Sequence, residues 1–318
     1  YQTLSDLRGY DLVYGLVIGL AGVGLMFLFW KIIKVEEKPT ESSSNWALEA
    51  SLIGFLGAII CLIPINIAER EVFFPIFNRF SFPSAFGVSI ATIGMIDYLV
   101  RSKWQNGIYA LLIFSAMLTQ YTNQDYFANR WIETQQLWQQ WKWRVPSLEK
   151  RTVLSGLYSQ TIEEGFFIWA PANLIYYTGA PNLVLGAEVL NETTINEIKM
   201  GNLLQREFRS FDYEFSLEQL LAFSKPTTNA CLRFLDKNQI ELSLNDSPLI
   251  AQVAPYSHIE KIGEVSTVDP SMFTKLFGDE EPETTWCYIY EKASLARQFS
   301  NWEEIIQLSD DIKADCDA

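Results

Sequence analysis

The sequence has few of the residues from which common enzyme active sites are built. Its 318 residues include one histidine, His258, and no glycine-rich phosphate loop. A Ser-His-Asp or Cys-His site would have to use His258, but the surrounding SHIEKI contains no nucleophile motif such as GxSxG. We therefore expect His258 to be a surface or hydrogen-bonded residue. The sequence predicts no catalytic residue and no cofactor, and whether the protein is an enzyme stays open.

Metal-ligating patterns are also lacking. The acidic run from Asp279 to Glu283 does not have the alternating spacing of a calcium loop. Asp315 and Asp317 form an Asp-x-Asp pair, but they lie at the polar end of the chain. We expect both acidic groups to be solvated surface, so the sequence predicts no metal site.

Basic residues are fewer than acidic ones. The chain has 24 Lys and Arg against 38 Asp and Glu, a net charge of −14. This balance argues against nucleic acid as a partner, because nucleic acid binding needs a basic face. The net charge is −2 over residues 1–125, with 8 basic and 10 acidic residues, and −12 over residues 126–318, with 16 and 28. Two regions of different character are therefore expected.

Cysteine is too scarce for a disulfide framework. Of the four cysteines, Cys61 lies in an apolar run, which leaves Cys231, Cys287 and Cys316. At most one disulfide can form among these three. The sequence does not decide whether Cys231 and Cys287 are its members.

Long runs without charge are the strongest signal in residues 1–125. Runs of 19, 19, 17 and 21 uncharged residues begin after Asp11, Glu49, Arg79 and Lys103. A bilayer core of about 30 Å needs about 20 such residues in a helix. The sequence therefore predicts a membrane all-α region, residues 1–125, with four spanning helices at residues 12–33, 46–68, 83–100 and 106–121.

Lysine and arginine indicate the orientation of these helices. Five basic residues fall in the first and third connections: Lys31, Lys34, Lys38, Arg101 and Lys103. Three fall on the opposite side: Arg8, Arg70 and Arg79. Because basic loops stay in the cytoplasm, the amino terminus and the acidic second region are expected outside it.

Two arginines at the expected outer surface are candidate ligand-binding residues. Arg70 and Arg79 flank the stretch EVFFPIF. An arginine fork can grip a phosphate, so both are candidates for binding a membrane lipid or a lipid-linked sugar. The competing interpretation pairs them with Glu69 and Glu71.

The stretch RWIETQQLWQQWKWRVP, residues 130–146, contains four tryptophans. On a helix, Phe127, Trp131, Trp138 and Trp141 fall on one side. We expect an interfacial amphipathic helix over residues 126–146, with these four rings at the membrane surface and Pro146 ending the helix. The alternative is an aromatic face packed on the outer domain or on neighbouring helices.

The remaining sequence predicts an extracytoplasmic α+β domain. It divides into a β-rich part, residues 147–284, and a helical hairpin, residues 285–318. Short β-rich segments lie at residues 152–158, 174–177, 183–185, 208–215, 230–235 and 240–244, with a hairpin turn at residues 236–239. Two helices are expected at residues 286–299 and 302–312, separated at Ser300-Asn301. Their small residues, Ala293 and Ala296, resemble the first hairpin of a tetratricopeptide-type repeat.

A wider resemblance rests on WCYIYEKASLARQFSNWEEIIQL, NACLRFLD, FNRFSFPSAFGVS and the tryptophan helix. Together they resemble the carboxy-terminal portion of large bacterial multi-pass membrane proteins, which are distantly similar to C-superfamily glycosyltransferases. The resemblance implies the bacterial cell membrane as the location. It carries over no catalytic residue, because the catalytic acid of those enzymes lies in the first outer loop, ahead of anything matched here.

Two functions are consistent with these observations. The first is a structural or interaction subunit, anchored by its helices, whose acidic outer domain meets a protein partner. The alternative is the non-catalytic half of a glycosyltransferase-like membrane protein that uses a lipid-linked sugar. In both, membrane lipids are the immediate surroundings of residues 1–125.

Overall fold

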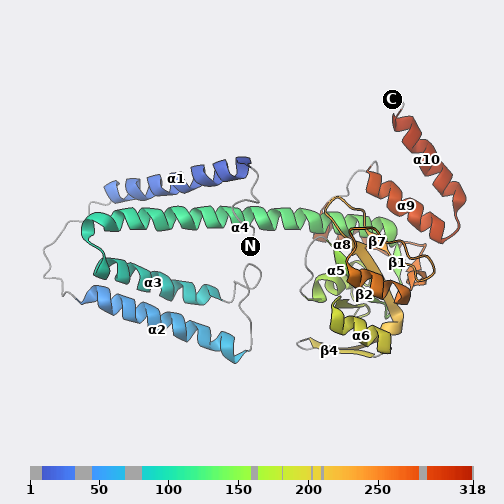
Figure 1. The fold of residues 1–318 in the computed structure, drawn as a ribbon, viewed down its shortest axis with the longest axis horizontal. Coiled ribbons are helices and arrows are strands. Elements are labelled where there is room, and N and C mark those ends of the chain that lie inside the picture. Colours follow the sequence, from blue (N-terminus) through green and yellow to red (C-terminus); the bar gives the residue numbers. More distant parts are fainter. Residues whose placement is uncertain are drawn as a thin grey trace. The chain divides into compact units, whose positions relative to one another are not determined.

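The fold is described from a computed structural model, which covers residues 9–32, 45–68, 81–158, 164–180, 182–201, 203–208, 211–278 and 285–316. The chain divides into two compact units, residues 1–129 and residues 130–318. We call the first the helical unit and the second the C-terminal domain. Figure 1 shows both, coloured along the sequence.

The helical unit contains three helices that are long and apolar enough to cross a membrane. These are α1 (Gly9–Ile32), α2 (Trp46–Ile67) and α3 (Phe82–Leu99), with candidate spans at Val13–Ile32, Trp46–Ile67 and Phe82–Leu99. Most of their large apolar side chains are exposed, which suits a surface surrounded by lipid rather than water. The first three predicted spans are confirmed as helices of spanning length and composition.

Small residues bring these helices together. A Cβ atom added at Gly87 of α3 would lie 2.5 Å from the backbone nitrogen of Ala58 in α2, and one at Gly54 would lie 2.6 Å from the carbonyl oxygen of Gly87. Such close backbone approach is typical of helix pairs in membranes. On α1, Gly15 and Gly19 instead make room for side chains of α4, those of Leu118 and Phe114.

Helix α4 (Ser102–Arg144) contains both the fourth predicted span and the tryptophan stretch. It is one continuous helix that ends two residues before Pro146, as expected from proline at that position. Helix α4 is long enough to cross a membrane, but its predicted span is not among the three candidates, because polar residues from Thr119 onward lower its apolar content. The fourth span therefore stays a prediction.

The C-terminal domain is built on a mixed four-stranded sheet with strand order β3-β2-β6-β7. Strand β2 (Val153–Tyr158) is parallel to both β3 (Gly186–Val189) and β6 (Leu220–Lys225), and β7 (Arg233–Phe234) is antiparallel to β6. Two further antiparallel pairs join β1 (Ser147–Leu148) to β8 (Ile262–Gly263), and β4 (Leu203–Phe208) to β5 (Phe211–Ser216).

Helices cover both faces of this sheet. One cluster of buried side chains joins Leu154 and Phe223 to α4, α5 (Phe166–Tyr176) and α8 (Pro270–Phe277). A second cluster joins Val153 and Ala222, on the opposite face, to α6 (Glu192–Met200) and α7 (Pro248–Val253). Adjacent strand residues thus point to opposite faces, and both faces are apolar because both are covered.

The chain ends in two helices, α9 (Trp286–Gln298) and α10 (Trp302–Cys316). Ser300, between them, has a positive φ of 58°, a left-handed conformation that ends α9 and redirects the chain. The predicted helices and the break at Ser300-Asn301 are confirmed. Three short 3₁₀ turns complete the domain, at Leu217–Gln219, Ala254–Tyr256 and Ile259–Lys261.

Several predicted strands are wrong. Residues 174–177 form the end of α5, because Asn173 fixes this helix by donating to the Leu185 carbonyl and accepting from the Val184 amide. Residues 240–244 contain no strand, and in residues 230–235 only β7 is extended. The predicted strand at residues 208–215 is divided, since Phe208 ends β4 and residues 211–215 belong to β5. The predicted turn at residues 236–239 is confirmed by a bridge between Asp236 and Gln239.

Candidate functional site

The last turns of α4 enter the core of the C-terminal domain. Trp138 stacks on Phe277 of α8 with ring centroids 5.2 Å apart, and Trp141 meets Phe234 edge to face at 4.8 Å. Both indoles are buried, at 1% and 0% exposed. The predicted position at the membrane surface is therefore wrong for Trp138 and Trp141. Their ring partners, Phe277 and Phe234, lie beyond Pro146 in the sequence. These rings bury the indoles more completely than a lipid boundary does.

The other two residues of the predicted aromatic stripe are half-exposed. Phe127 belongs to the helical unit, and Trp131 lies at the start of the C-terminal domain. Trp131 also stacks on Phe277, at 6.4 Å. For Phe127 and Trp131 the membrane-surface position stays a prediction.

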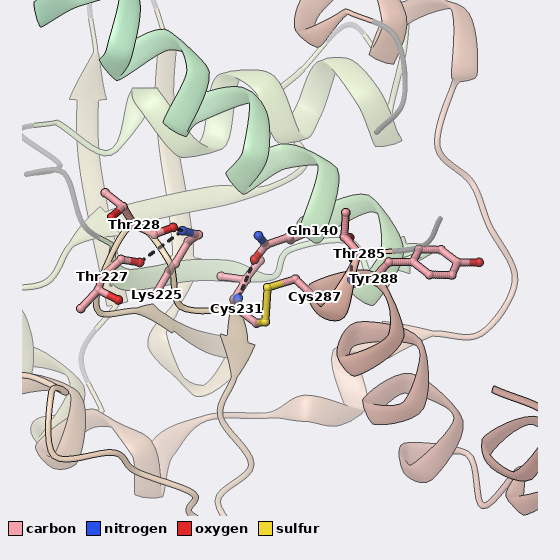
Figure 2. Close-up of a disulfide and its surroundings, with 9 residues drawn as sticks. Gln140, Lys225, Thr227, Thr228, Cys231, Thr285, Cys287 and Tyr288 are labelled. Carbon is pink, nitrogen blue, oxygen red and sulfur yellow. Dashed lines mark hydrogen bonds between the residues drawn. A yellow bond between two sulfur atoms is a disulfide. The ribbon is translucent and has the colours of Figure 1, made fainter. Parts of the chain in front are cut away.

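A polar face on the same helix leads to the candidate site. Gln140 and Arg144 are four residues apart, so they lie on one side of α4, and both are buried. The Gln140 side-chain oxygen accepts a hydrogen bond from the Leu232 amide, 2.7 Å away, as Figure 2 shows. This bond fixes α4 to the segment that begins β7.

A disulfide joins that segment to α9. Cys231 and Cys287 are bonded, with Cα atoms 5.2 Å apart (Figure 2). Thr285 starts α9 by accepting a hydrogen bond from the Tyr288 amide at 3.2 Å. On the other side, the buried Lys225 ammonium donates to the Thr228 carbonyl at 2.6 Å and so holds the loop before Cys231. Three separate segments are therefore held together at one place.

A cavity of about 730 Å³ opens between these segments. Its walls come from the end of α4, residues 232–239 with Glu241, the residues Ile259, Glu260 and Ile262, and one side of α9. This volume is within the range of small-molecule sites. The α9 residues follow helical spacing from Cys287, since Glu291, Ser294 and Gln298 lie one, two and three turns further along the same side.

Two buried ionisable side chains border this cavity with polar atoms that lack hydrogen bonds. Among the described residues, Arg144 Nη1 and both carboxylate oxygens of Glu291 have no partner. Burial lowers the pKa of Arg144 to about 10, although attraction to Glu291 works in the opposite direction. Burial also raises the pKa of Glu291 well above its ordinary value. A buried polar atom without a partner costs about 1–3 kcal/mol, and a charged one costs more.

Three ion pairs join most of the other charged groups around the cavity. Arg297 bonds Glu241 at 2.8 Å, Arg233 bonds Asp246 at 2.6 Å, and Lys237 bonds Glu260 at 2.9 Å. Burial of Glu260 opposes its charged form, but hydrogen bonds from Lys237 and its neighbours outweigh this and lower its pKa to about 2. Asp236 also lines the cavity, outside these three ion pairs, and its carboxylate accepts a hydrogen bond from the Asn238 amide at 2.8 Å.

His258 belongs to this rim network and has no catalytic partner there. Its Nδ1 lies 2.7 Å from Glu260 and 2.9 Å from Lys237. The prediction of a hydrogen-bonded histidine is confirmed. No cluster of His, Cys, Asp or Glu suited to a metal ion occurs in the part of the chain that the structure describes.

The predicted phosphate-binding pair cannot be placed, since Arg70 and Arg79 lie outside the described residues. The acidic run from Asp279 to Glu283 also lies outside them. The residues that sequence reasoning missed are Arg144 and Glu291. The available signal was an acid on the same side of α9 as Cys287 and Leu295, a side that helical spacing marks as buried.

Comparisons of this chain with protein-family models, with curated proteins and with solved structures find no match. The resemblance to bacterial multi-pass proteins therefore stays a prediction.

Proposed function

We propose that this multi-pass membrane protein is an interaction subunit that presents its C-terminal domain on the outer side of a bacterial cell membrane. The observation that carries the proposal is the Cys231–Cys287 disulfide. Disulfides persist in oxidising compartments and are rare in the cytosol. The acidic surface of the domain then faces a protein partner outside the cell.

An outward domain requires a fourth span. Arg101 and Lys103 lie between α3 and the apolar part of α4, so the C-terminal domain stays on their side of the membrane unless α4 crosses. Two contacts support a crossing. Phe114 and Leu118 of α4 pack on glycines of α1, and the Tyr109 hydroxyl donates to Asp97 at the end of α3, 2.8 Å away. The apolar turns of α4 thus pack with two helices that can span.

The alternative function, as part of a glycosyltransferase-like protein, depends on Arg70, Arg79 and a lipid-linked sugar. It stays a prediction from the sequence resemblance. The interaction subunit is preferred because it needs only the helices, the disulfide and the acidic domain.

Cysteine labelling in intact cells tests the proposal. In a background with Cys61→Ala and Cys316→Ser, one variant carries Ser43→Cys in the first connection and another carries Leu244→Cys, which is fully exposed on the C-terminal domain. An impermeant maleimide should label Leu244→Cys at once and Ser43→Cys only after permeabilisation. The opposite pattern would reject both the orientation and the outward domain.

A further inference from the structure

The cavity beside α9 is bordered by buried polar atoms that make no hydrogen bond with the described residues. Four atoms are involved: Arg144 Nη1, Glu291 Oε1, Glu291 Oε2 and Gln298 Oε1. All belong to residues that border the cavity, and none has a partner among the residues described. The first atom is a donor, Gln298 Oε1 is an acceptor, and the carboxylate accepts when ionised.

The arrangement of the walls keeps these atoms from satisfying one another. Gln298 uses its amide nitrogen to donate to the Ile259 carbonyl at 3.0 Å, so its oxygen is left over. Arg144 lies on α4. Gln140, one turn earlier on the same helix, holds α4 in place by accepting a hydrogen bond from the Leu232 amide. Glu291 is fixed on α9, which the disulfide bonds to Cys231 one turn earlier. The two charges face the same space from two elements that are held apart.

Glu291 has no surface exposed to water although it borders the cavity. Its carboxylate therefore lies just behind the wall, and contact with a ligand requires a side-chain rotation. Tyr290 and Phe299 also line the cavity and offer ring faces for apolar contact. Polar groups set against apolar surface are the usual composition of a small-molecule site.

Charge decides which ligand fits. An anion would meet Arg144 but would lie against the Gln298 carbonyl and Glu291. A cation would meet Glu291 but would lie against Arg144, and a zwitterion would bring two more charges out of water. Arg233, Lys237 and Arg297 are already paired, and Asp236 is the rim carboxylate outside these three pairs. The unpartnered atoms instead require a ligand that both accepts and donates hydrogen bonds.

We propose that this cavity binds a small uncharged molecule whose hydroxyl or amide groups accept from Arg144 and donate to Glu291 and Gln298. Hydroxyl and amide groups each combine donors with acceptors, so one molecule serves both walls. The site lies entirely in the C-terminal domain, and the inference does not depend on the side of the membrane on which that domain lies.

The test uses the full chain in nanodiscs and ligand-observed NMR. One panel holds uncharged probes, namely monosaccharides, disaccharides and capped amino-acid amides. The other holds inorganic phosphate, putrescine and glycine. The inference predicts saturable binding by at least one uncharged probe and none by the charged probes. The uncharged probe that binds distinguishes a hydroxyl ligand from an amide ligand.

Variants then locate the site. Arg144→Met combined with Glu291→Leu replaces the buried pair by apolar side chains of similar size, which a folded domain tolerates. This variant should bind the same probe at least about tenfold more weakly, because both hydrogen-bonding partners are lost. Lys261→Gln combined with Glu149→Gln is the matched control, since it removes an ion pair of 2.8 Å outside the cavity. Its affinity should be unchanged. No binding by any uncharged probe, or equal binding by the two double variants, would overturn the inference.

Discussion

Tryptophan side chains differ in their exposure between the two units, although helix α4 contributes tryptophans to both. On α4, Trp104 in the helical unit is 64% exposed, while Trp138 and Trp141 in the C-terminal domain are almost fully buried. In the helical unit, glycines bring backbones together and large side chains point outward. In the C-terminal domain, large rings fill the interior. The comparison shows that residue type alone does not tell whether an aromatic side chain meets lipid or a protein core.

The largest expected effect separates these two kinds of tryptophan. Trp141→Ala should lower the free energy of unfolding of the C-terminal domain by about 4 kcal/mol, because it leaves a large cavity in the core. Trp104→Ala, at an exposed ring, should change it by less than about 0.5 kcal/mol. Hydrogen exchange of the domain in full-length protein measures both. Equal losses of protection would mean that the two rings have similar surroundings.

Removing the disulfide comes next. Cys231→Ser should destabilise the C-terminal domain by about 3 kcal/mol, because the bond closes a loop between residues 56 apart in sequence. Urea unfolding followed by near-ultraviolet circular dichroism measures the loss. Cys61→Ser, in α2, is the control and should leave that transition in place. An unchanged urea midpoint in Cys231→Ser would show that the disulfide does not stabilise the domain.

A glycine pair tests the helical unit. Gly87→Leu should cost about 2 kcal/mol, because the new side chain meets the α2 backbone. Gly57→Leu should be tolerated, since nothing lies within 4 Å of a Cβ atom there. Thermal unfolding in nanodiscs compares the two variants. Similar midpoints would show that α2 and α3 are not packed through Gly87.

The smallest effect concerns Glu291 and pH. Its pKa is raised in the folded state by burial, so the folded state holds this proton to higher pH than the unfolded state, whose pKa is about the ordinary 4.5. Stability should therefore fall as pH rises above 4.5 toward the folded pKa.

Glutamine mimics the protonated acid, so Glu291→Gln should remove this slope. The comparison starts at pH 5, where the lowered pKa values of Asp246 and Glu260 keep both groups ionised in the folded state. Urea midpoints of the wild type and of Glu291→Gln at pH 5, 6 and 7 measure the difference. Parallel pH profiles would show that the folded and unfolded states bind the same number of protons at Glu291, and that its pKa is not raised.

The sequence predicted the features that depend on local pattern. Uncharged runs located α1, α2 and α3, and helical periodicity with a break at Ser300-Asn301 located α9 and α10. It misread the end of α5 as a strand, because Leu174 to Tyr177 favour extended structure locally while Asn173 and the domain core stabilise a helix. Strand β6 went unnoticed because it is buried on both faces and shows no alternation.

The candidate site could not be predicted for a different reason. Arg144 and Glu291 approach one cavity from positions far apart in sequence, and neither belongs to a motif. The sequence allows one disulfide among three cysteines without deciding which two form it. The pairing of Cys231 with Cys287 depends on how α9 packs against the segment before β7. Such pairings come from tertiary packing, which local pattern does not encode.

The outward position of the C-terminal domain is tested most directly by the redox state of its cysteines in living cells. Acid quenching protonates the thiols and stops exchange, and free thiols are then alkylated at neutral pH in denaturant. Disulfides are next reduced, and a second reagent of different mass marks the thiols released. Mass spectrometry should find the second mass on Cys231 and Cys287 and the first mass on Cys61, which is unpaired. The first mass on Cys231 and Cys287 would place the domain in a reducing compartment and contradict the account.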